Sequence, residues 1–74
     1  MKDKGHIVIH LEELLDQANM SKLQFSYKAD IVPNQVTAYC RNQRQKLDIN
    51  ILTRMCEVLG CSIGDLIEYI PPEN

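Results

Sequence analysis

The feature of this sequence that most constrains its fold is a pair of helix start signals set close together, at Ser21 and Pro33. The stretch "SKLQ" is a capping box, in which Ser21 and Gln24 each satisfy a backbone N–H that would otherwise lack a partner. Proline is favoured at the first position of a helix, where its missing N–H costs no hydrogen bond. Two helices of about eight residues therefore have to fit between residues 21 and 41.

The residues between these two helices predict a tight turn. Asp30 is the expected break, because Asp and Asn tolerate left-handed backbone angles better than other non-glycine residues. The second helix has apolar residues at the spacing of one buried face, at Val36, Tyr39 and Cys40. Helices at 21–29 and 33–41, joined by residues 30–32, form the pattern of a helix-turn-helix.

Further signals predict helices on both sides of this motif. Before it, four apolar residues at helical spacing predict a first helix, with Leu11, Leu14, Leu15 and Ala18 on its inner face. After it, Asp48 is expected to cap a fourth helix that ends at Gly60. The inner face of that helix is expected to hold Leu52, Met55, Cys56 and Leu59. Ser62 opens a short fifth helix that is expected to continue to about Glu68.

The β-rich residues 6–9 leave room for one short strand before the first helix. The length of 74 residues favours one domain. We therefore expect residues 1–74 to form a single all-α domain of five helices, with a short N-terminal strand as an option.

The composition excludes several classes of protein. No apolar run approaches the roughly 20 residues that span a bilayer, and acids interrupt the apolar start, so a cytoplasmic protein is expected. Three cysteines cannot form a fully paired disulfide framework, and their spacing matches no zinc site; we expect them to be small buried hydrophobes. Nothing indicates a catalytic pocket. We expect no enzyme activity, cofactor, metal or small-molecule ligand.

Charge is distributed unevenly along the chain, which has a net charge of −2. Residues 22–46 hold one acid, Asp30, and five cations: Lys22, Lys28, Arg41, Arg44 and Lys46. The remaining residues hold three cations and nine acids. A basic patch on an acidic chain is typical of proteins that bind a polyanion. Charge alone is explained equally well by a basic face exposed to solvent.

The helix-turn-helix and the basic segment together favour DNA as the polyanion. In this motif the second helix enters the major groove and reads bases with its N-terminal residues. Asn34 and Gln35 directly follow Pro33, and these two amide side chains can make paired hydrogen bonds to adenine. Outside such a motif, both amides would be interpreted as ordinary residues at a helix start.

The sequence also resembles the lambda-repressor-like, Xre-type family of phage Cro and repressor helix-turn-helix transcriptional regulators. The resemblance covers residues 7–70 and rests on "IHLEELL", "MSKLQFSYKADI", the spacing from Val36 to Leu47 and "LTRMCEVLGCSIGDLIEYIP". Three residues depart from the family pattern: Asp30 replaces the turn glycine, Val32 replaces a polar cap, and Asn42 stands where a glycine is usual. A missing cap costs about 1 kcal/mol.

The resemblance implies a role for individual residues. The base-reading positions would be Asn34, Gln35, Thr37 and Ala38. Ala38 has no polar group and could only touch a thymine methyl. The phosphate-contacting positions would be Ser21, Lys22, Arg41, Arg44 and Lys46.

We therefore expect a sequence-specific regulator that binds double-stranded operator DNA as a homodimer, and a repressor of prophage or mobile-element type. The dimer contact is expected at the termini, in "HIVIH" and "LIEYI", where a strand at residues 6–9 would have an edge that another strand could pair with. The alternative is an antitoxin-like or anti-repressor module that uses the same fold to bind a protein. The two functions differ in whether DNA binding weakens steeply as salt rises.

Overall fold

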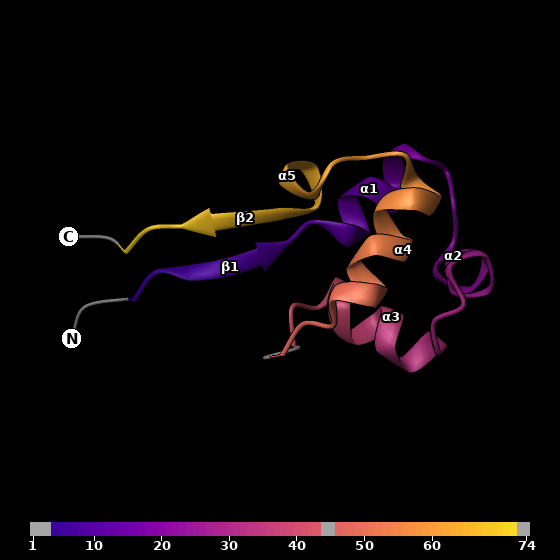
Figure 1. Ribbon diagram of the computed structural model, residues 1–74, viewed down its shortest axis with the longest axis horizontal. Coiled ribbons are helices and arrows are strands. Elements are labelled where there is room, and N and C mark those ends of the chain that lie inside the picture. The colour runs from indigo at the N-terminus through magenta and orange to yellow at the C-terminus, as the bar shows by residue number, and fades with distance from the viewer. Residues whose placement is uncertain (1–3, 44–45, 73–74) are drawn as a thin grey trace.

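The computed structural model describes residues 4–43 and 46–72. Its helices pack together on one side, and the two terminal strands lie side by side and project from them (Figure 1). In chain order the described elements are β1 (His6–Ile9), α1 (Leu11–Gln17), α2 (Lys22–Ala29), α3 (Pro33–Cys40), α4 (Ile49–Leu59), α5 (Ile63–Leu66) and β2 (Ile67–Ile70). The prediction of five helices is confirmed for this part of the chain, and so is the strand at residues 6–9. No helix among the described residues has the length and apolarity to cross a membrane.

The two strands form an antiparallel ribbon that extends away from the helices (Figure 1). His6 pairs with Ile70 at its outer end, and Ile9 pairs with Ile67 at its inner end. The prediction that the fifth helix continues to Glu68 is wrong, because α5 ends at Leu66. The β-branched and aromatic residues that follow favour a strand, and β1 supplies the backbone partners that this strand needs. The pairing occupies one edge of β1 within the same chain.

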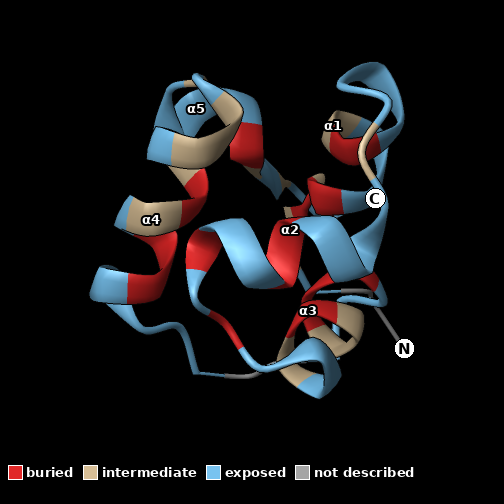
Figure 2. Cartoon of the chain, turned by 90° about the vertical axis from the view of Figure 1, so that its right-hand side faces the viewer, coloured by how far each residue is buried: buried red, intermediate tan, exposed pale blue. Residues whose placement is uncertain are grey.

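The helices pack around one buried cluster, and Figure 2 shows where its residues lie on α2, α3 and α4. The largest fully buried side chains come from four helices and the end of a fifth: Tyr39, Phe25, Leu11, Met55, Leu66 and Val36. The predicted inner face of α3 is confirmed, since Val36, Tyr39 and Cys40 are all buried.

Two predictions about buried residues were wrong in part. Ala18 is exposed rather than on the inner face of α1, because the helix ends at Gln17 and Ala18 is only its C-cap. Of the three cysteines, all of them free thiols, only Cys40 is buried, while Cys56 and Cys61 are half-buried.

Desolvation by burial raises the pKa of the Cys40 thiol above its ordinary value.

The predicted helix caps are present. Ser21 Oγ accepts a hydrogen bond from Gln24 N (3.1 Å), and Ser21 N donates to Gln24 Oε1 (2.9 Å), so the capping box of α2 is complete. Asp48 Oδ1 accepts from Asn50 N (2.8 Å) at the start of α4. Val32, as expected, makes no side-chain cap for α3.

His10 joins the ribbon to α1 through two hydrogen bonds. Its Nε2 lies 2.7 Å from Glu68 Oε1 on β2, and its Nδ1 lies 3.1 Å from Glu13 Oε1 on α1. Both hydrogen bonds raise the pKa of His10 above its ordinary value of 6.5, and the bond to Glu68 has the larger effect. Protonated His10 therefore acts as a clamp between the ribbon and the helix.

We expect Glu68→Gln to lower the melting temperature more at about pH 6 than at about pH 8.5. A raised histidine pKa contributes stability that is fully present below the unfolded-state pKa and is lost as pH rises through the folded-state pKa. The effect is small because both carboxylates are well exposed. Thermal unfolding at the two pH values measures it, with Glu12→Gln on α1 as the control, because Glu12 is exposed and does not contact His10. Equal losses at both pH values would contradict the clamp.

Candidate nucleic-acid interface

The helix-turn-helix predicted at about residues 21–41 is present as α2, a tight turn and α3. Asp30 ends α2 in the left-handed conformation (φ 57°), as its backbone tolerance predicts. Ile31 N then donates to Ser26 O (3.0 Å), and the buried Ile31 side chain anchors the turn in the core. The backbone hydrogen bond and the buried side chain together fix the direction in which α3 leaves α2.

The predicted base-reading residues lie on one stretch of α3. Asn34 is exposed, whereas Gln35, Thr37 and Ala38 are half-buried. The side of α3 that faces away from the core, where exposed side chains are expected, is therefore only partly exposed. Within the described residues, no hydrogen bond engages the side chains of Asn34 or Gln35. Both amides therefore retain their donors and acceptors for a ligand.

The described phosphate-contact candidates lie at two places. Ser21 and Lys22 are exposed at the N-terminus of α2. Arg41 and Lys46 are exposed after α3, and Arg44 lies outside the described residues. No carboxylate lies between Asp30 and Asp48 to repel a phosphate near Arg41 and Lys46.

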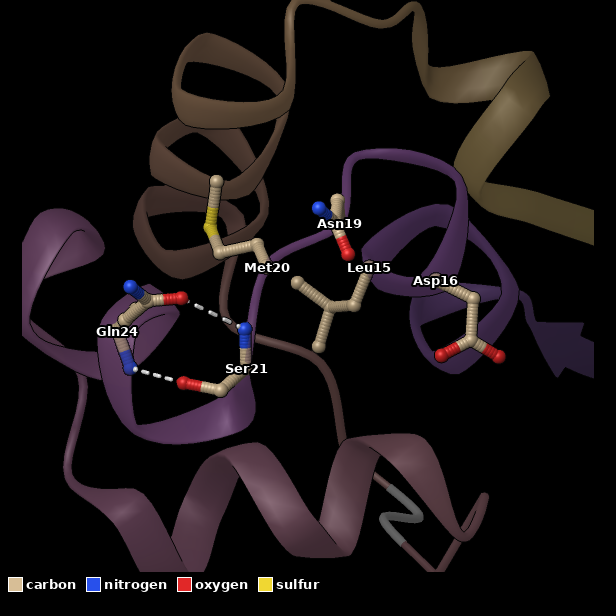
Figure 3. A pocket seen from close by; sticks show the side chains of 6 residues that line it. All are labelled: Leu15, Asp16, Asn19, Met20, Ser21 and Gln24. Carbon is tan, nitrogen blue, oxygen red and sulfur yellow. Dashed lines mark hydrogen bonds between the residues drawn. The ribbon is translucent and has the colours of Figure 1, made fainter.

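The N-terminus of α2 borders a hollow of about 360 Å³ between α1 and α2 (Figure 3). Its lining residues are Leu15, Asp16, Asn19, Met20, Ser21 and Gln24. The capping hydrogen bonds between Ser21 and Gln24 cross one side of it, and the Asp16 carboxylate lies on another (Figure 3). A phosphate inside the hollow would meet that negative charge, so the exposed Ser21 hydroxyl and Lys22 are better placed to contact DNA at its rim.

Asn42 fixes the loop after α3, and the sequence interpretation did not identify this role. It has a left-handed backbone (φ 56°) directly after Arg41, the C-cap of α3. Its Oδ1 accepts from Ile9 N (2.6 Å), and its Nδ2 donates to Ile9 O (3.2 Å). Asn42 thus joins the end of α3 to the end of β1. The unusual asparagine was visible in the sequence, but its distant partner was not.

We expect Asn42→Gly to lower the free energy of unfolding by about 1–3 kcal/mol. Glycine accepts the left-handed backbone, so the substitution removes the two hydrogen bonds to Ile9 without adding backbone strain. Asn19→Gly is the matched control, because Asn19 is also exposed with φ 56° and makes no side-chain hydrogen bond within the described residues. Urea unfolding compares the variants. If both variants lose the same free energy of unfolding, the added flexibility of glycine, and not the loss of the hydrogen bonds to Ile9, causes the destabilisation.

Among residues 4–43 and 46–72, no group of three or more His, Cys, Asp or Glu side chains could hold a metal ion.

Comparisons with known proteins place this fold in a family. A search of curated proteins finds no match to the chain. A solved structure, "Crystal structure of transcriptional regulator VanUg, Form II", has a TM-score of 0.73 and 20% sequence identity, covering 93% of this chain and 91% of that chain. At this identity the likeness shows a shared fold. The Cro/C1-type HTH DNA-binding domain matches residues 10–72. The chain therefore belongs to the Cro/C1-type helix-turn-helix family of DNA-binding domains.

Proposed function

We propose that the chain recognises a specific double-stranded operator and represses transcription there, as a regulator of prophage or mobile-element type. The observation that carries this proposal is the pair of free amides, Asn34 and Gln35, in the first turn of α3. Major-groove recognition uses the N-terminal residues of this helix. In this proposal residues 1–74 act in the cytoplasm as one domain, and they repress by covering the operator.

The base-reading residues divide by chemistry. Asn34 and Gln35 each offer an amide that pairs with the major-groove edge of adenine. Thr37 offers a hydroxyl on the same helix, and Ala38 offers a methyl group for contact with thymine. These four residues set which operator is bound.

The phosphate-contacting residues set how tightly any DNA is held. Ser21 and Lys22 contact one stretch of backbone at the start of α2, where the helix N-terminus also favours anions. Arg41, Arg44 and Lys46 contact another stretch after α3. Contacts to phosphate position a protein on the duplex without directly reading its sequence.

We expect the double substitution Arg44→Ala with Lys46→Ala to weaken binding to all DNA sequences by similar factors. Each lost phosphate contact lowers the slope of log affinity against log salt by about 0.9. Fluorescence anisotropy over a salt series measures the slope. Lys28→Ala is the matched control, since Lys28 belongs to the same basic segment but is not a proposed contact. An unchanged slope in the double variant would remove both residues from the interface.

The chain is proposed to bind its operator as a homodimer. One reading helix covers only a few base pairs, and proteins of this type bind paired half-sites about 34 Å apart along the duplex. The contact between copies lies at the termini, away from α3. A protein that binds no DNA at any salt concentration would instead favour the antitoxin-like or anti-repressor alternative.

A further inference from the structure

One face of the terminal ribbon is apolar along its whole length. Residues paired directly across two strands share a face, so Ile9 with Ile67, and Ile7 with Tyr69, lie on the same side. Ile9 is buried and Ile67 is half-buried at the inner end, whereas Ile7 is 50% and Tyr69 60% exposed at the outer end. The apolar face thus continues from the core out to the part of the ribbon that extends beyond the helices (Figure 1).

The Tyr69 side chain on β2 lies against Gly5, the residue before β1. A Cβ built on Gly5 would lie 2.5 Å from the Tyr69 hydroxyl oxygen, so the missing side chain of Gly5 makes the space that the ring uses. The ring is therefore held against the ribbon and needs little further ordering to contact a partner.

A second apolar surface lies between α4 and α5. It is a groove of about 440 Å³ lined by Ile49, Leu52, Thr53, Cys56, Glu57, Ile63 and Ile67. Ile49 is 78% exposed and Ile63 is 53% exposed. Ile67 belongs to both surfaces, so the groove and the ribbon face form one continuous apolar area. Contiguous exposed apolar surface on a protein marks an interaction site.

We propose that the occupant of the α4–α5 groove is the ribbon of a second copy of this chain. Both parts are apolar, and one projects from the helices while the other is a groove between them. A two-fold axis near Ile67 lets each copy place Ile7 and Tyr69 against Ile49 and Ile63 of its partner, which is a closed, self-complementary arrangement. An isolated two-stranded ribbon is only marginally stable, so this contact also supports the ribbon.

The proposed contact brings two opposite charges, on Lys4 and Glu57, toward each other. Lys4 is exposed just outside β1, at the outer end of the ribbon, and Glu57 lies in the lining of the groove. Opposite charges that meet across an interface favour this pairing and fix its register. The choice of a second copy as the occupant rests on the proposed function, because paired half-sites require two reading helices.

Sedimentation equilibrium of the protein without DNA tests the proposal through a pair of complementary variants. Ile7→Lys changes the ribbon and Ile63→Glu changes the groove. Each alone is expected to weaken dimerisation on the order of tenfold or more, because a charge then faces an apolar surface. An equimolar mixture is expected to regain dimers, since Lys on one ribbon meets Glu in the partner groove while the other contact stays wild type. Tyr27→Glu is the control, because Tyr27 is 76% exposed on α2 outside this surface.

The results that would overturn the proposal are distinct. If the wild-type protein is still monomeric at about 100 μM, a second copy does not occupy the groove, and a different kind of partner would have to. If neither Ile7→Lys nor Ile63→Glu weakens dimerisation, the contact lies elsewhere. The same conclusion follows if each variant alone is monomeric and the equimolar mixture does not regain dimers. Circular dichroism verifies that each variant is folded, and Ile49→Glu provides a second groove variant with the same expected result.

The proposal and the function can fail separately. A wild-type monomer that binds a specific operator would overturn this interface and keep the proposed function. A dimer with the expected variant behaviour that binds no DNA would keep the interface and overturn the proposed function.

Discussion

Replacing Phe25 by alanine is expected to lower the free energy of unfolding by about 3–5 kcal/mol. Phe25 is fully buried on α2, in the cluster that joins the helix-turn-helix to the other helices. Its removal leaves a cavity where the surrounding helices cannot fully collapse. Domains of this size have roughly 0.05–0.15 kcal/mol of stability per residue, so the substitution removes a large part of the total.

Tyr27→Ala is the matched control for this substitution. Tyr27 lies two positions along the same helix but is exposed, and it makes no hydrogen bond within the described residues. Its truncation is expected to change stability by about 0.5 kcal/mol or less. Urea unfolding followed by circular dichroism compares the two variants. Similar midpoints for both would mean that the core does not lie around Phe25.

Gln35→Ala is expected to change which bases the protein prefers at one position of the operator. Loss of a good paired contact costs about 1–3 kcal/mol at the base it reads. Gln35 is half-buried in the first turn of α3, and its amide makes no hydrogen bond within the described residues. Asn34→Ala is expected to act in the same way at a neighbouring base.

Site selection from random DNA measures this change for each variant beside the wild type. Gln17→Ala provides the control, since Gln17 is an exposed glutamine at the end of α1, outside the proposed interface. If the preferred site is unaltered in Gln35→Ala while overall affinity drops, the amide contacts backbone and does not read a base.

The parts of the fold that could be predicted are those set by local sequence. The capping box at Ser21, the left-handed turn at Asp30 and the cap at Asp48 each depend on residues a few positions apart, and all three are present. The strand β2 was missed because its partner β1 lies at the other end of the chain. The β-branched and aromatic residues after Leu66 favour a strand, but so short a segment forms one only where another strand supplies its backbone partners, and a short sequence window does not show that partner.

The candidate site shows the same division. The helix-turn-helix register gave the positions of Asn34 and Gln35 on α3, because that register follows from two nearby helix starts. The partial burial of Thr37 and Ala38 could not be predicted, since it depends on how α3 packs against elements that are distant in the chain. The two hydrogen bonds from Asn42 to Ile9 join residues 33 positions apart, and no local pattern reveals such a pair.

Specific DNA binding by the wild-type protein is tested most directly by selection of bound duplexes from random DNA, followed by a salt titration of the selected site and a scrambled one. We expect one recurrent site, with two half-sites in inverted orientation, that binds at least about 1000-fold more tightly than scrambled DNA. Binding to both is expected to weaken steeply as salt rises. Failure to enrich any site, or equal affinity for selected and scrambled DNA, would contradict operator recognition through α3.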